Sequence, residues 1–219
     1  PGYPADAVAW LLHGAGGRVV DVGAGTGKLT SQVAVLAEAV LAVDPDEAML
    51  EVLSRALPAV ETVVGRAEDI PLPDASVDAV VLGQAWHWVD VDVASAEIAR
   101  VLRPGGVLGL IWNIRDSREP WVSDLGDAMH GSKAEQLIEG DGPRVCAPFD
   151  ALEHRTWEWA REVTAGDLRA MARSRSHYID GDVEYRDAVD ARVDAVLASL
   201  PGGTVAMPYV THAYRAHRP

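Results

Sequence analysis

The sequence predicts an α/β fold in which a doubly wound, mostly parallel sheet carries helices on both faces. Short runs rich in Val, Leu and Ile recur along the first half of the chain and show little polar alternation, which is typical of strands buried on both faces. Segments with helical spacing of apolar residues separate these runs. Runs and segments alternate at about the length of a β-α-β unit, so neighbouring strands are expected to be parallel.

The first half of the chain supplies five of the predicted strands and three helices. Apolar residues return at helical spacing within residues 29–37 and again within 94–102. Asp46 is expected to cap a third helix, because an aspartate ahead of an apolar-periodic segment accepts hydrogen bonds from the first backbone amides. The five strands are expected at residues 18–22, 39–44, 60–64, 77–82 and 107–112.

The pattern changes after residue 113. Residues 119–143 mix helix-forming residues with glycine and proline, and residues 152–163 predict a strand. A long amphipathic helix is expected over about residues 182–200, because valines and leucines line one of its faces before Pro201 ends it. The remaining residues are expected to form a final strand.

Composition limits the possible partners and compartments. The chain has 219 residues, of which 48% are hydrophobic and 24% charged, as in one ordinary globular domain. A net charge of −14 argues against nucleic acid, since neutralising phosphates requires a basic surface. The lone Cys146 has no cysteine or histidine at ligand spacing, so we predict neither a disulfide nor a metal site. Without an 18-residue apolar stretch or a secretory signal, we expect a cytoplasmic protein with no membrane partner. Because Pro1 is not methionine, we expect further residues ahead of it.

A glycine-rich segment, VVDVGAGTGKLT at residues 19–30, resembles three kinds of ligand-binding loop. A nucleoside-triphosphate loop would need glycine and a hydroxyl at positions occupied by Val22 and Leu29. A dinucleotide loop would need its third glycine at Lys28, but that glycine comes one position early, at Gly27. Both of these loop types are therefore disfavoured.

The third kind, a loop for a nucleoside without phosphates, fits the residues. Gly23, Gly25 and Gly27 allow the backbone to turn sharply and to pass close to a ligand. Asp21 adds negative charge, which would repel a pyrophosphate but suits a ligand that carries an ammonium and a sulfonium. Asp44 follows about 20 residues later, where an acid can accept hydrogen bonds from ribose hydroxyls. Dinucleotide enzymes share that acid, so the discriminating features are Asp21 and the glycine spacing.

Four blocks in order carry a resemblance to a known family. VVDVGAGTGKLT, LAVDPDEAML, GRAEDIPLPDASVDAVV and ARVLRPGGVLGLIWN resemble the class I S-adenosylmethionine-dependent methyltransferases of the type-11, small-molecule kind. PGYP and QAWHW are similar to a subgroup that includes trans-aconitate-type methyltransferases. The resemblance implies a seven-stranded, Rossmann-like sheet with a helical lid insertion and an antiparallel C-terminal strand. It also implies S-adenosylmethionine as cofactor and S-adenosylhomocysteine as product.

The resemblance further implies roles for individual residues at the cofactor. The glycine loop would run under the methionine part, whose amino group would face Asp21 and the carbonyl of Gln84. Asp44 would take the ribose hydroxyls, and Pro45 would pack against adenine. Many relatives have an acid where this chain has Arg66, which leaves the partner of the adenine amino group open. The predicted cofactor set, in which Ala67 and Glu68 meet the adenine edge, is Asp21, Gly23, Gly25, Gly27, Asp44, Pro45, Ala67, Glu68 and Gln84.

The acceptor side is predicted from the residues after the fourth and fifth strands. His87, between Trp86 and Trp88, lies where open α/β sheets bind ligands. It could serve as a catalytic base, as a hydrogen-bond donor to substrate, or only in packing, and a base is needed only when the nucleophile arrives protonated. Arginines at 115–118 and 169–175 stand out in an acidic chain and could hold an anion, although a solvated helix face is an equal alternative. The predicted substrate residues are Tyr3, Trp86, Trp88, Arg115 and Arg173.

We therefore expect methyl transfer from S-adenosylmethionine to a small-molecule acceptor, including carboxylates and other anionic metabolites. The alternatives are a non-catalytic protein that binds the cofactor or a partner on this fold and, less favoured by the glycine spacing, a dinucleotide-dependent oxidoreductase. A single domain is expected over residues 1–219. Within it, residues 1–113 would bind the cofactor, 114–200 would form the substrate and lid excursion, and 201–219 would add the final strand.

Overall fold

The structure, a computed structural model, describes residues 1–149 and 151–219. The chain forms two compact units. Unit 1 comprises Pro1–Asn113, Leu137–Trp157 and Thr211–Pro219, and unit 2 comprises Ile114–Gln136 and Glu158–Val210.

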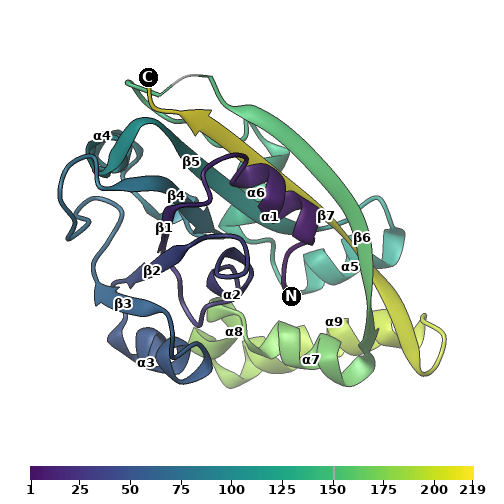
Figure 1. The fold of residues 1–219 in the computed structure, drawn as a ribbon. Helices are drawn as coiled ribbons and strands as arrows, with labels where there is room; N and C mark the ends of the chain where they lie inside the picture. The colour runs from purple at the N-terminus through teal and green to yellow at the C-terminus, as the bar shows by residue number, and fades with distance from the viewer. Residues whose placement is uncertain (150) are drawn as a thin grey trace. The chain divides into compact units, whose positions relative to one another are not determined.

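The described residues form a seven-stranded sheet in the order β3-β2-β1-β4-β5-β7-β6 (Figure 1). It is mostly parallel, with an antiparallel C-terminal strand, which confirms the predicted fold class. Strands β1 to β4 belong to unit 1, whereas β5, β6 and β7 each contain residues of both units. The strands are β1 (Arg18–Val22), β2 (Ala39–Asp44), β3 (Glu61–Val64), β4 (Val77–Gly83), β5 (Leu102–Arg115), β6 (Glu153–Thr164) and β7 (Thr204–His217).

The strand order creates a crevice at the carboxyl ends of β1 and β4. These two strands are parallel neighbours, with Asp21 opposite Val81. From β1 the chain continues outward to β2 and β3, and from β4 it continues the other way to β5. Crossovers that leave in opposite directions open a gap at the strand ends, which is where open α/β sheets bind ligands.

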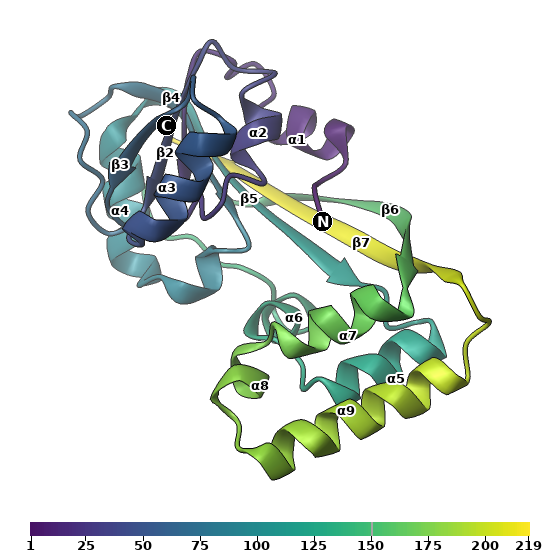
Figure 2. The same ribbon diagram turned by 90° about the horizontal axis from the view of Figure 1, so that it is seen from below.

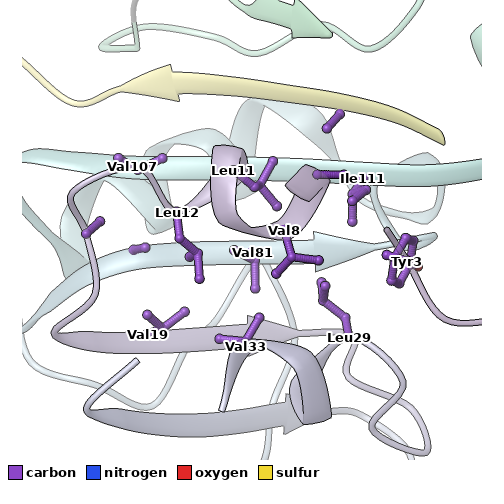
Figure 3. Close-up of a cluster of buried hydrophobic side chains, with 14 residues drawn as sticks. Tyr3, Val8, Leu11, Leu12, Val19, Leu29, Val33, Val81, Val107 and Ile111 are labelled. Atoms are coloured by element: carbon purple, nitrogen blue, oxygen red, sulfur yellow. The ribbon is translucent and has the colours of Figure 1, made fainter. Parts of the chain in front are cut away.

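Helices cover both faces of the sheet in unit 1. Buried side chains of α1 and α2 pack with Val19, Val81 and Val107 of the strands, and Figure 3 shows Tyr3 at the end of this cluster, near Leu29. Figure 2 shows α4 on the opposite side of the strands from α1 and α2. As predicted, the Asp46 carboxylate caps α3 by accepting from the amides of residues 48 and 49. These elements are α1 (Ala5–Leu11), α2 (Thr30–Val33), α3 (Glu47–Ala56), the 3-10 helix η1 (Trp86–Trp88) and α4 (Val91–Val101).

Unit 2 is mainly helical and has its own core. The predicted amphipathic helix is present as α9 (Val183–Ala198), whose Val189 and Val193 are buried against α5 and α7. The other helices are α5 (Pro120–Ala128), α7 (Ala165–Arg173) and α8 (Ser176–Asp180), while α6 (Lys133–Glu139) crosses from unit 2 into unit 1. Among the described residues, none of these helices combines the length and apolar character that crossing a bilayer requires.

Candidate functional site

Two neighbouring cavities lie at the carboxyl ends of the central strands of unit 1. The larger is about 430 Å³ and the smaller about 240 Å³, and both are lined by Gly23 and Gln84. The larger cavity is also lined by Asp44, Pro45, Arg66, Ala67, Glu68 and Trp88. The smaller cavity is also lined by Tyr3, Asp21, Gly25, Thr26, Lys28 and Gly83. The structure thus brings together most of the residues that the sequence predicts for a cofactor.

The glycine loop needs its glycines for different reasons. Gly23 has a φ of +69°, and a Cβ there would lie 2.7 Å from the Cβ of Ala85, so a side chain would clash as well as strain the backbone. Gly25 has a φ of +54°, and a Cβ there would meet no atom within 4 Å, because the loop faces open space at this point. Gly27 lines neither cavity. A Cβ on Gly27 would lie 2.9 Å from Leu53 of α3, which makes it a packing position.

Asp44 supports the glycine loop from the end of β2. One of its carboxylate oxygens accepts from the Gly25 amide at 2.8 Å, and the other accepts from the Asp46 amide at 2.9 Å. The side chain is 8% exposed and lines the larger cavity. Because each carboxylate oxygen can accept more than one hydrogen bond, Asp44 can hold the loop and still accept from a ligand hydroxyl.

Asp21 carries an unpaired oxygen at the smaller cavity. The residue is fully buried, and its Oδ2 accepts from the Thr30 hydroxyl at 2.6 Å. Its Oδ1 has no hydrogen-bond partner in the protein. Burial raises the pKa of this carboxyl to about 7, while the Thr30 hydroxyl lowers it and the charge on Asp44 raises it further. A buried, unpaired acceptor is unfavourable, so this oxygen fits a ligand that donates to it and carries positive charge.

Gln84 stands between the two cavities in an unusual conformation. Its φ is +57°, a left-handed value that is uncommon for a residue with a side chain and is often retained at binding sites. Its side-chain nitrogen, Nε2, donates to the backbone oxygen of Asn113 at 3.0 Å. This contact leaves the side-chain oxygen as the end that can accept from a ligand ammonium.

The larger cavity has the features of a nucleoside pocket. Pro45 and the exposed ring of Trp88 supply flat apolar surface, and Ala67 is buried at the wall. Glu68 accepts from the backbone amide of Asp90 at 2.9 Å, which fixes its carboxylate beside the N-terminus of α4. Arg66 also lines this cavity.

The smaller cavity contains residues that the sequence did not predict, and it also contains Tyr3, which was predicted to contact the substrate. Lys28 and Thr26 line it, although the sequence showed Lys28 only as a mismatch to a dinucleotide loop. Tyr3 is held there by Gln32, which bonds both its amide nitrogen and its carbonyl oxygen. Burial, and next the charge on Asp21, raises the pKa of the Tyr3 phenol. The phenol can therefore donate a hydrogen bond but does not serve as a base near neutral pH.

The three aromatic residues of the QAWHW segment have different surroundings. Trp88 is 68% exposed and lines the larger cavity, whereas Trp86 is buried and donates from its indole to the backbone oxygen of Arg144 at 2.9 Å. His87 lines neither cavity and lies 3.4 Å from the indole nitrogen of Trp112, which donates to its Nδ1. The structure therefore places His87 against Trp112 and away from the residues that line the cavities.

The two predicted substrate arginines both lie in unit 2 and both have carboxylate partners. Arg115 is 6% exposed and bonds Glu135 at 2.5 Å. Arg173 bonds Asp190 at 2.9 Å on the surface of α7. In the described parts of the chain, no group of three or more His, Cys, Asp or Glu side chains could hold a metal ion.

Comparison with known proteins identifies the family. The family model described as a methyltransferase domain matches residues 20–110. A methyltransferase of Mycobacterium tuberculosis is 44% identical over 220 residues, covering 99% of this chain and 89% of the relative. The chain belongs to the class I S-adenosylmethionine-dependent methyltransferases. This methyltransferase therefore uses S-adenosylmethionine as its cofactor, and the predicted enzyme class and cofactor are confirmed.

The methyltransferase is also similar to solved and more distant proteins. A structure from Anaeromyxobacter dehalogenans, predicted to be a type II methyltransferase, superposes with a TM-score of 0.70 at 27% identity, covering 98% of this chain and 96% of the other. The malonyl-[acyl-carrier protein] O-methyltransferase of Yersinia pestis is 37% identical over 137 residues, which is 62% of this chain and 47% of that enzyme.

Proposed function

We propose that this methyltransferase binds S-adenosylmethionine across the two cavities of unit 1 and methylates a small-molecule acceptor with a carboxylate or another anionic group. The observation that carries the cofactor assignment is the unpaired, buried Oδ1 of Asp21 beside the glycine loop. It fits an ammonium donor. The neighbouring open side of Gly25 fits close approach of a ligand to the backbone.

The residues present would divide the cofactor between the cavities. Asp21 and the side-chain oxygen of Gln84 would hold the amino group of the cofactor's methionine part in the smaller cavity. Lys28 lines the same cavity and could pair with the carboxylate of that methionine part. Asp44 would hold the ribose hydroxyls, and Pro45 would pack against adenine in the larger cavity. Ala67, Glu68 and Arg66 are the adjacent candidates for the adenine edge. Gly23 would lie under the bound molecule where the cavities meet.

When bound, S-adenosylmethionine supplies a methyl group already activated by its sulfonium. The protein's task is therefore to orient the acceptor and exclude water. A carboxylate acceptor needs no base, whereas a protonated acceptor does. His87 is poorly suited to be that base, because it lines neither cavity and its Nδ1 accepts from the Trp112 indole. This favours an acceptor that is nucleophilic without deprotonation.

Two further observations support an anionic acceptor. The Yersinia relative is named for O-methylation of a malonyl group, which bears a free carboxylate. The arginines of residues 115–118 and 169–175 lie in unit 2, and those at 115, 118, 169 and 173 bond carboxylates. In a chain with a net charge of −14, a local basic site among the described residues would therefore centre on Arg175. We further propose that the chain acts as one cytoplasmic domain, in which residues 1–113 bind the cofactor and residues 114–200 determine acceptor specificity.

The acceptor class can be tested with cofactor labelled in the methyl group and a metabolite extract divided by anion exchange. We expect label to transfer to the acidic fraction and the product to be a methyl ester that alkali hydrolyses. Asp44→Ala serves as the control and should reduce transfer at limiting cofactor, because it weakens cofactor binding. Label found only in neutral apolar compounds or in nucleic acid would refute the anionic acceptor.

A further inference from the structure

We propose that unit 2 contains a binding site for a small anion, a carboxylate or a phosphate, with Arg175 as the residue that recognises it. The proposal deepens the proposed function and rests on it, because it names the side chain of unit 2 that would hold the anionic group of the acceptor. It rests on an imbalance of charge among half-buried and buried groups.

The imbalance begins with a buried ion pair whose acid is already fully used. Arg115 and Glu135 bond at 2.5 Å, and their side chains are only 5% and 14% exposed. The other carboxylate oxygen of Glu135 accepts from both the amide and the hydroxyl of Ser132, at 2.7 and 3.0 Å. The second nitrogen of Arg115 faces the sulfurs of Met129 and Met171, which are weak acceptors. Glu135 therefore has little capacity for a second guanidinium.

Arg175 is that second guanidinium. It is half-buried, and its Nε is buried without a hydrogen-bond partner. Burial, and next the positive charge of Arg115, lowers the pKa of its guanidinium, and Glu135 offsets this in part. Glu135 bonds Arg115, and among the described residues no carboxylate bonds Arg175, so the positive charge of Arg175 has no bonded counter-charge. A buried, unpaired charged donor is costly, and an anion bonded by a guanidinium in two-point geometry would remove that cost.

The surroundings provide a further donor and an apolar wall. Tyr209 is 4% exposed and its ring stacks on Trp159 at 4.9 Å. Arg115, Arg161 and Arg175 all lie close enough for their charges to act on its phenol. Burial is the largest influence and raises the pKa of that phenol, so the hydroxyl stays protonated and can donate to an anion. The proposed site would combine the guanidinium edge of Arg175 with this phenol donor, beside the apolar cluster that contains Met171 and Trp159.

Arg175 differs from neighbouring arginines that have acids of their own. Arg118 bonds Asp116 and Glu158, and Arg169 bonds Asp194 at 2.8 Å. The ion pair of Arg169 is exposed and joins α7 to α9. Arg169 is therefore a matched control for removing one positive charge from unit 2.

The test is calorimetric titration of the full chain with glutarate and, separately, with inorganic phosphate. We expect saturable binding of at least one of them, and the preferred probe tells whether the site fits a carboxylate or a phosphate. Arg175→Gln should weaken this binding at least tenfold. Arg175→Lys should weaken it less, since it keeps the charge but loses the two-point geometry. Arg169→Gln should leave it unchanged, and dimethyl glutarate, which is neutral, should not bind.

The Nε–H resonance of Arg175 in ¹⁵N-labelled protein gives a second readout that needs no variant to fold. It should shift on addition of the anion that binds. Wild-type protein that binds neither anion, or Arg175 variants that bind as the wild type does, would overturn the site. S-adenosylhomocysteine titrations on the same samples test the proposed function separately, because both cofactor cavities lie in unit 1.

Discussion

Cofactor binding is expected to remove a proton from Asp21, so the pH dependence of affinity reports directly on its role. Burial is the main reason that its pKa rises to about 7 in the free protein. A bound ammonium would favour the ionised carboxylate and lower that pKa. Below pH 7, Asp21 of the free protein mostly carries a proton that ligand binding must displace. Affinity is therefore expected to fall as the pH falls.

The size of the effect follows from the same value. At pH 6, about one unit below the pKa of Asp21 in the free protein, the protonated carboxyl outnumbers the ionised form roughly tenfold. Its ionisation then costs about 1.4 kcal/mol. The Kd of S-adenosylhomocysteine should therefore be about tenfold higher at pH 6 than the limit reached above pH 7. S-adenosylhomocysteine is the suitable ligand because its amino group is its cation near neutral pH.

Calorimetry at a series of pH values, in pairs of buffers with different ionisation enthalpies, measures both the affinity and the protons released. We expect release of nearly one proton per ligand at pH 6. Asp21→Asn should bind more weakly at high pH and should lose this pH dependence, whereas Tyr3→Phe should keep it. A wild-type Kd that does not change between pH 6 and 7.5, or an Asp21→Asn curve with the wild-type slope, would refute the reasoning.

Three other expectations follow from contacts in the structure. Asp44→Ala should weaken S-adenosylhomocysteine binding by about 1–3 kcal/mol, because it removes both the acceptor that holds the Gly25 amide and the predicted partner of the ribose. Calorimetry measures this change, and an unchanged affinity would mean that other residues bind the ribose. Glu135→Gln should lower the free energy of unfolding in urea by about 3 kcal/mol, since it leaves the charged Arg115 buried without a counter-charge. Glu158→Gln, in an exposed pair, should cost less than about 1 kcal/mol, and equal effects of the two variants would contradict this reasoning. His87→Ala should reduce kcat less than tenfold with a carboxylate acceptor, and a fall of about a hundredfold or more would indicate a base.

The sequence predicted the part of the molecule where local pattern and tertiary structure agree. Buried parallel strands are apolar throughout, so β1, β2 and β4 were recognisable, and the capping aspartate Asp46 marked the start of α3. The cofactor prediction depended on glycine spacing and on Asp21. That spacing distinguishes loop types because each glycine allows a backbone conformation that other residues avoid.

Side-chain pairing was much less accessible from the sequence. Glu135 lies 20 residues beyond Arg115, and no local pattern indicates that they bond. The same holds for Arg175, because the sequence does not show that its Nε is buried without a hydrogen-bond partner. The second role of Asp44, as support for the glycine loop, also required coordinates, because it depends on where a backbone amide points. The role of Gly27 also required coordinates, because only the structure shows that this glycine faces α3 and packs there and does not line a cavity.

The most direct test of the central claim, that the paired cavities beside the glycine loop hold S-adenosylmethionine, is equilibrium titration of the wild-type protein with S-adenosylhomocysteine and with NAD. We expect saturable binding of one S-adenosylhomocysteine per chain, competed by S-adenosylmethionine, and no response to NAD, because Asp21 and the glycine spacing do not suit a pyrophosphate. Saturable NAD binding with no response to either adenosyl ligand would contradict the account.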